Sequence, residues 1–188
     1  MKNTMRFFSS IALLIIVICC FTACSTLDVT TDMSDSSVLE FFVALQDNDV
    51  LPFTITERAK VTLREQESLF LENTEHNLSN FTDFSLEYKV LTKNIDKHGD
   101  KLVYLTEAYV LDISETQLDE ETMFTELHLL DLDGNSYYIL SLAAYDNIFE
   151  GDYVCAYALP LGETSFENIS GGTTLAIVSA GCYIEKIS

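Results

Sequence analysis

The stretch Asp131-Leu132-Asp133-Gly134-Asn135 has the most metal-like spacing in this 188-residue chain. Calcium loops place oxygen ligands at alternate positions and use glycine where the backbone bends. The common twelve-residue calcium loop ends in a glutamate, whereas the twelfth position counted from Asp131 is Leu142. Asp-Gly between two apolar runs also favours a tight hairpin turn. The sequence therefore predicts a turn first, and a weak calcium site helped by the acidic residues 119–121 as the alternative.

Tyrosines are the second group of residues with binding chemistry. All nine lie between Tyr88 and Tyr183. Tyrosine combines an apolar ring with a polar hydroxyl, so it suits both half-buried strands and contact surfaces. We expect a candidate ligand face made of Tyr104, Tyr109, Tyr137 and Tyr138. The alternative is that these rings pack the core of a β domain or its rim.

Catalytic and cofactor motifs are sparse. His76, His98 and His128 lie far apart, and none has a Cys or His neighbour at metal-ligand spacing. The chain has neither a Gly-x-Ser-x-Gly motif nor a glycine-rich loop ending in Lys-Ser or Lys-Thr. The sequence predicts a protein that is not an enzyme and carries no cofactor.

Two cysteines lie in apolar, strand-like runs near the C-terminus, at Cys155 and Cys182. In an exported protein they could oxidise to a disulfide if their strands were antiparallel neighbours. Free cysteine is also among the most buried residue types. Both states remain open from the sequence.

Residues 1–23 have a cationic head with Lys2 and Arg6, an apolar run at 11–18, and small residues just before Cys24. This order is typical of a secretory signal peptide. Because it ends at a cysteine, it resembles the lipobox of bacterial lipoproteins, although Phe21 stands where that family usually has an aliphatic residue. The resemblance implies that residues 1–23 are removed and that Cys24 receives a diacylglyceryl group. The expected location is extracytoplasmic, with the lipid in the cell membrane.

Two other interpretations of this segment are weaker. A spanning helix needs about 20 apolar residues, and residues 7–23 reach roughly that length only by including Ser9, Ser10 and Thr22. Cys19 and Cys20 are alternative lipidation sites, but the large residues at 17–18 before them disfavour cleavage.

The charge of the chain excludes one class of partner. The full sequence carries a net charge of −20, and the mature part would retain 8 basic against 30 acidic residues, or −22. Nucleic-acid affinity comes mostly from Lys and Arg that neutralise phosphates. The sole local basic cluster is Lys89, Lys93, Lys97 and Lys101. We therefore expect no nucleic-acid partner.

The elements that must position these residues follow from periodicity. Residues 24–35 are predicted to be a tether, and residues 36–80 a helical segment with helices near 38–45 and from Thr54 or Thr56 onward. Alternation predicts strands over 84–90, 101–113, 126–130, 137–142, 151–159 and 173–187. Residues 114–121 are predicted to be a loop, and residues 143–150 a short helix.

The C-terminal pattern resembles an OB-fold barrel, carried by residues 99–103, 108–110, the hairpin 130–138, residues 151–154 and the closing strand 184–187. The residues that carry this resemblance belong to the last five of the six predicted strands. The predicted fold class is α+β: the helical segment, then a five-stranded antiparallel OB-like β-barrel over 81–188. A β-sandwich is the alternative. Together these features predict a lipid-anchored, non-enzymatic binding or adaptor module for a protein, peptide or cell-wall ligand, and the alternative is a calcium-responsive surface domain.

Overall fold

The computed structural model describes residues 37–46, 51–75, 77–119, 122–167 and 171–187. The predicted signal peptide and tether, including Cys24, lie outside these ranges. Within the described ranges, no helix is both long enough and apolar enough to cross a membrane.

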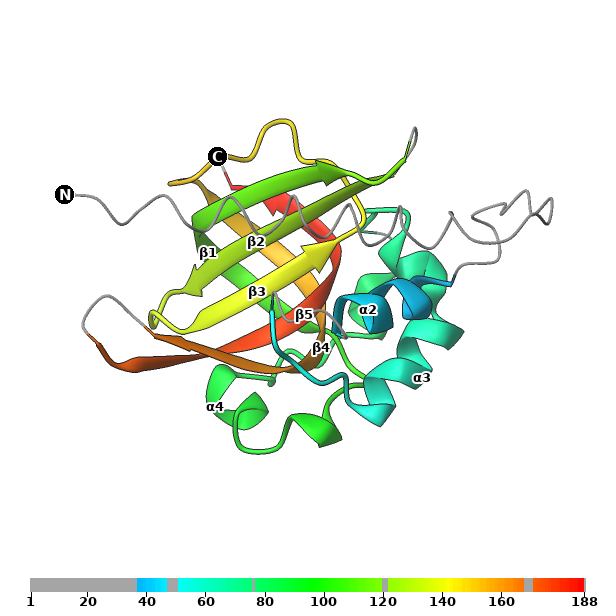
Figure 1. Ribbon diagram of the computed structural model, residues 1–188, viewed down its shortest axis with the longest axis horizontal. Helices are drawn as coiled ribbons and strands as arrows, with labels where there is room; N and C mark the ends of the chain where they lie inside the picture. The colour runs from blue at the N-terminus through cyan, green and yellow to red at the C-terminus, as the bar shows by residue number, and fades with distance from the viewer. Residues whose placement is uncertain (1–36, 47–50, 76, 120–121, 168–170, 188) are drawn as a thin grey trace, which may run out of the picture.

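Five strands close into a barrel in the order β1-β2-β3-β5-β4 (Figure 1). They are β1 (Val103–Gln117), β2 (Met123–Asp131), β3 (Ser136–Ser141), β4 (Tyr153–Glu167) and β5 (Thr173–Lys186). The predicted five-stranded barrel is therefore confirmed. The prediction that it is antiparallel throughout is wrong, because β3 and β5 pair in parallel. A closed ring with an odd number of strands cannot alternate direction all the way round.

The barrel has an apolar interior and a second apolar core outside it. Alternation along the strands directs Leu127, Leu129 and Ile139 inward, where they are fully buried. The sequences of β4 and β5 are nearly continuous apolar runs because one face of each strand packs in the barrel interior and the other in the outer core. Their outward side chains, including Leu159 and Val178, pack against the segment that precedes the barrel.

Helices α2 (Val38–Gln46) and α3 (Glu57–Glu65) and the 3-10 helix η1 (Glu67–Phe70) lie beside the barrel in Figure 1. The Thr56 hydroxyl caps α3 by accepting the backbone N–H of Ala59 at 3.3 Å. The Thr56 backbone N–H donates to the carbonyl of Leu161 on β4 at 2.9 Å. The chain just before α3 therefore lies directly on β4, where Gly162 leaves room for the backbone of Thr54.

The predicted strand over 84–90 is wrong. Residues 84–87 form a turn and an irregular connection that lead into the short helix α4 (Tyr88–Leu91). Two 3-10 helices, η2 (Leu78–Asn80) and η3 (Ile95–Lys97), come before and after this stretch. The Asp83 side chain accepts the Ser85 backbone N–H at 2.9 Å, and the Asp83 carbonyl accepts that of Leu86. Asp is a turn residue because its side chain bonds the backbone two residues on. Here that local bond overrides the alternation of apolar residues.

Two connections also differ from prediction. Residues 114–117 extend β1 instead of beginning a loop, because they pair with residues 123–126 of β2. Residues 143–150 form turns instead of a helix. Tyr145 in that connection is buried, and its hydroxyl lies 2.8 Å from that of Ser141.

Candidate functional site

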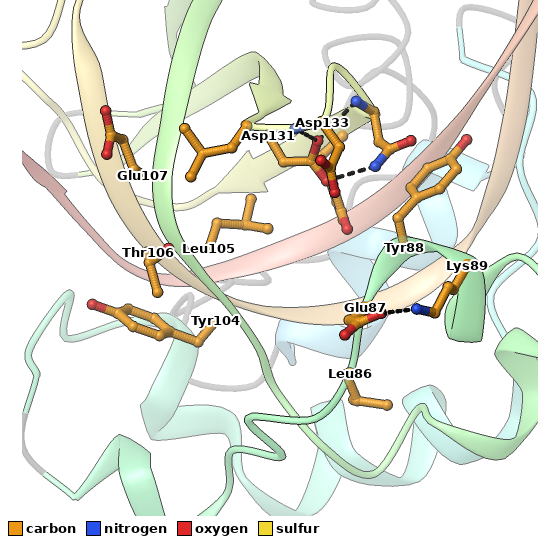
Figure 2. Close-up of a pocket in the computed structure, with 13 residues that line it drawn as sticks. Leu86, Glu87, Tyr88, Lys89, Tyr104, Leu105, Thr106, Glu107, Asp131 and Asp133 are labelled. Carbon is orange, nitrogen blue, oxygen red and sulfur yellow. Dashed lines mark hydrogen bonds and ion pairs between the residues drawn. The ribbon is translucent and has the colours of Figure 1, made fainter.

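A pocket of about 410 Å³ lies between the first residues of β1, the β2–β3 hairpin and α4. It is lined by residues 86–89, residues 104–107 and the hairpin residues Asp131, Leu132, Asp133, Asn135 and Tyr137. Figure 2 shows Tyr104, Thr106 and Glu107 on one side of β1, with Glu87, Tyr88, Lys89 and the two aspartates on the other. The pocket therefore brings together segments from three separate parts of the sequence.

The pocket exists because β1 is longer than its neighbour β2. The pairing of β1 with β2 ends where Ala108 faces Asp131. Beyond this point β1 continues back to Val103, and among the described strands its only partner there is β4. The register with β4 shifts between Leu105 and Ala108, so Thr106 and Glu107 form a bulge there, and both are exposed.

The hairpin turn on the pocket rim is held by Asp131. One oxygen of its carboxylate accepts the backbone N–H groups of Asp133 and Asn135 at 3.0 and 2.8 Å, and the other accepts the Asn135 side-chain amide at 2.9 Å. Gly134 adopts a φ of 79°, which glycine tolerates best. The predicted turn is thus present, and both oxygens of Asp131 are used within it. Among the described residues, no three His, Cys, Asp or Glu side chains gather as a metal-binding group.

The pocket lining is strongly acidic. Among the described residues, four carboxylates line it, Glu87, Glu107, Asp131 and Asp133, against the single cation Lys89. The Lys89 ammonium lies 2.5 Å from the Glu87 carboxylate, and that hydrogen bond raises the pKa of Lys89. The charges of Lys89 and Glu87 cancel each other. The other three carboxylates therefore leave the pocket with a net negative charge.

Tyrosine rings supply apolar surface to the same pocket. Tyr137 projects from the barrel interior and is 1% exposed, and its burial raises the pKa of its hydroxyl. The Tyr88 ring packs edge-on to it at 5.7 Å between centroids. The Tyr88 hydroxyl donates to the carbonyl of Leu175 on β5 at 2.8 Å, which fixes this wall of the pocket to the barrel.

No family model matches this chain, and neither the curated proteins nor the solved structures gave a match.

The four tyrosines predicted to form one face are divided among three places. Tyr104 and Tyr137 line the pocket. Tyr109 instead packs edge-on to Tyr153 of β4 at 5.5 Å. Tyr138 projects from the opposite face of β3 and stacks on His128. Adjacent residues of a strand point to opposite faces, so Tyr137 and Tyr138 cannot share one.

His128, Tyr138 and Phe166 form a separate cluster on the outside of the barrel. The His128 and Tyr138 rings stack at 4.4 Å, and Phe166 packs edge-on to His128 at 5.5 Å. The His128 Nε2 atom lies 2.6 Å from the Ser136 hydroxyl. Burial lowers the pKa of His128, although the nearby Asp112 opposes the shift. A histidine with a lowered pKa is neutral at pH 7, so its ring acts here as a packed aromatic group.

Cys155 and Cys182 are both free thiols in the structure. The antiparallel register places Cys155 opposite Glu185. Cys182 lies in the outer apolar core, where burial raises the pKa of its thiol. A thiol with a raised pKa is a poor nucleophile at neutral pH.

Sequence reasoning missed one wall of the pocket. Glu87, Tyr88 and Lys89 fall within the segment predicted to be a strand. Of the three, only Lys89 was considered from the sequence, as part of the local basic cluster. The Asx-turn signal at Asp83-Phe84-Ser85 could have identified the turn that brings them to the barrel. Leu132 was also passed over, although its side chain on the rim is 70% exposed.

Proposed function

We propose that this protein is a lipid-anchored, extracytoplasmic binding module that holds a cationic ligand without transforming it. The observation that carries the proposal is the pocket between β1 and the β2–β3 hairpin. Its acidic lining attracts positive charge, and the partly exposed rings of Tyr88 and Tyr104 offer apolar contact to the rest of a ligand. Anionic ligands would meet the repulsion of both the pocket and the whole chain.

We also propose that the barrel is of the OB type. The strand order β1-β2-β3-β5-β4 and the closure of five strands support this assignment. OB barrels bind ligands on the face of their second and third strands and on the adjoining loops. Here the hairpin of β2 and β3 forms one wall of the pocket.

Binding is tested by thermal shift of the full chain in detergent, with five probes. The probes are a short lysine-containing peptide, its glutamate counterpart, calcium chloride, a cell-wall glycan fragment and a single-stranded oligonucleotide. We expect only the lysine peptide to raise the melting temperature, by about 5 °C at a hundredfold excess over its dissociation constant. The shift should shrink with added salt, because the carboxylates at the rim are open to screening.

A charge-matched pair of variants locates the binding. The double variant Glu107→Gln with Asp133→Asn removes two exposed carboxylates from the pocket. Its affinity for the lysine peptide should be about fivefold lower than that of the wild type. The control variant Asp146→Asn with Glu150→Gln makes the same charge change at two exposed residues of the 143–150 connection. Its affinity for the lysine peptide should equal that of the wild type. Equal weakening in both variants would contradict a site in this pocket. A shift with calcium alone would favour the calcium-responsive alternative that uses Asp131 and Asp133.

Anchoring is tested separately at Cys24. The Cys24→Ser variant lacks the thiol that would carry the lipid, so we expect it to move from the membrane fraction to the soluble fraction. Fractionation of cells expressing the wild-type and variant chains measures this directly. Cys19→Ser and Cys20→Ser are the matched controls and should stay with the membrane. If Cys24→Ser stayed in the membrane fraction like the wild type, lipid anchoring through Cys24 would be contradicted.

A further inference from the structure

We infer that the ligand is an extended, basic segment of a partner protein that adds as a strand to the free edge of β1 at Tyr104–Glu107. This inference rests on the proposed function, since it assumes that the pocket binds a cationic ligand. It goes further by naming the class of partner and the backbone groups that bind it.

Within the described part of the chain, strand β1 has an unpaired edge at its start because its neighbours differ in length. On one side, β1 pairs with β4 through Val103, Tyr104 and Leu105, which face Ala158, Tyr157 and Ala156. On the other side, β2 stops at Asp131, opposite Ala108, and the chain turns through residues 131–135 into β3. The line along which β2 would continue is therefore occupied by the pocket. A strand entering here would extend the barrel wall instead of stacking on it.

The backbone N–H and C=O of Tyr104 point toward the unpaired side of β1. The Leu102 N–H donates to the carbonyl of Phe81 at 2.9 Å, and the Leu102 carbonyl accepts the N–H of Asp83 at 3.1 Å. Residues two apart in a strand direct their N–H and C=O groups to the same side. The N–H and C=O of Tyr104 therefore point to the side that β4 does not occupy.

The open edge has the length of a short strand. It runs from Tyr104 to Glu107, four residues or about 13 Å at the usual rise per residue. Residues 81–83 close one end by pairing with Leu102, and the turn at 131–135 closes the other. Peptides recognised by strand addition gain affinity from main-chain hydrogen bonds and specificity from pockets for alternate side chains.

The charge of the pocket favours a partner segment in which basic and apolar residues alternate. Every second side chain of an added strand would face the same set of neighbours. On one side of β1, Asp131 and Asp133 favour Lys or Arg and the exposed Leu132 offers contact to apolar residues. On the other side, Glu107 favours a basic residue and the ring of Tyr104 offers apolar contact. A second copy of this chain would bring a net charge of −20 to an acidic edge, so the geometry favours a basic partner over self-association.

Backbone methylation of the ligand tests the inference. The probe is an eight-residue peptide of alternating Lys and Val, binding to the full chain in detergent. Two isomers carry N-methyl groups either on all Lys or on all Val residues, which blocks one edge of the peptide at a time. We expect one isomer to lose at least tenfold in affinity and the other to stay within about threefold of the parent.

The outcomes separate this inference from the proposed function. Equal affinities of both isomers and the parent, or equal losses in both isomers, would overturn strand addition while leaving binding in the pocket intact. Failure of the parent peptide to bind would overturn the proposed function itself.

Amide hydrogen exchange supplies a second measurement on the same complex. With the parent peptide bound, the Tyr104 amide should exchange at least tenfold more slowly. The Leu105 amide is the control in the same strand, because it faces β4 and is protected with or without peptide. An unchanged Tyr104 amide in the bound state would overturn the proposed pairing.

Discussion

Replacing Gly162 with alanine is expected to lower the free energy of unfolding by about 3 kcal/mol. A Cβ atom at this position would overlap the carbonyl oxygen of Thr54 and crowd the rest of that peptide group. The obstacle is backbone, which cannot swing away as a flexible side chain can. Thr56 is also tied to Leu161 by a backbone hydrogen bond, so moving the 54–56 segment away from β4 would break this contact as well.

Chemical denaturation followed by circular dichroism measures this effect, and Gly134→Ala is its control. Gly134 has a positive φ and no other atom within 4 Å of an added Cβ, so alanine there costs only backbone strain of about 1 kcal/mol. The larger loss at Gly162 therefore reports crowding between β4 and the preceding segment. Equal losses at the two glycines would contradict the close approach of Thr54.

Replacing Phe42 with alanine is expected to lower the free energy of unfolding by about 4 kcal/mol. Phe42 on α2 is 1% exposed and belongs to the same apolar core as Leu159 and Val178 of the barrel. Removing its ring would leave a cavity between helix and barrel in addition to losing the apolar contact itself. The prediction tests whether α2 is part of the folded domain.

Phe84→Ala serves as the comparison for Phe42, because Phe84 is 63% exposed. Its edge contact with Tyr104 is partly solvated, so its loss should cost less than about 1 kcal/mol. Both variants should unfold in one cooperative transition. If Phe42→Ala loosened only the helices, a separate early transition would appear and the barrel would melt as in the wild type.

Periodicity was sufficient to predict the barrel strands but not how they close. The hairpin at 131–135 followed from Asp-Gly between apolar runs, and the structure has it with Asp131 bonded to the turn. The parallel pairing of β3 with β5 could not come from local pattern, since pairing partners are chosen by tertiary contacts. The prediction of a strand over 84–90 was wrong because the Asp83 side chain stabilises a turn there. A single side chain that bonds the local backbone can compete with strand formation.

The candidate site was predictable only in part. Tyr104, Tyr137, Asp131 and Asp133 were selected from the sequence, and all four line one pocket. Their grouping depends on the ends of β1 and β2 and on a bulge at Thr106, none of which leaves a clear sequence signal. Lipidation at Cys24 stays a prediction, because that residue lies outside the described ranges.

The contact between α2 and the barrel has a consequence for the order of folding. Phe42 belongs to the same core as residues 159–182, more than a hundred positions later in the chain. Contacts between such distant residues slow folding, because a long loop must close before they form. During synthesis, the apolar side of α2 would remain uncovered until β4 and β5 have emerged. A protein built this way would have to remain unfolded, or be shielded by a chaperone, until nearly its whole length is available.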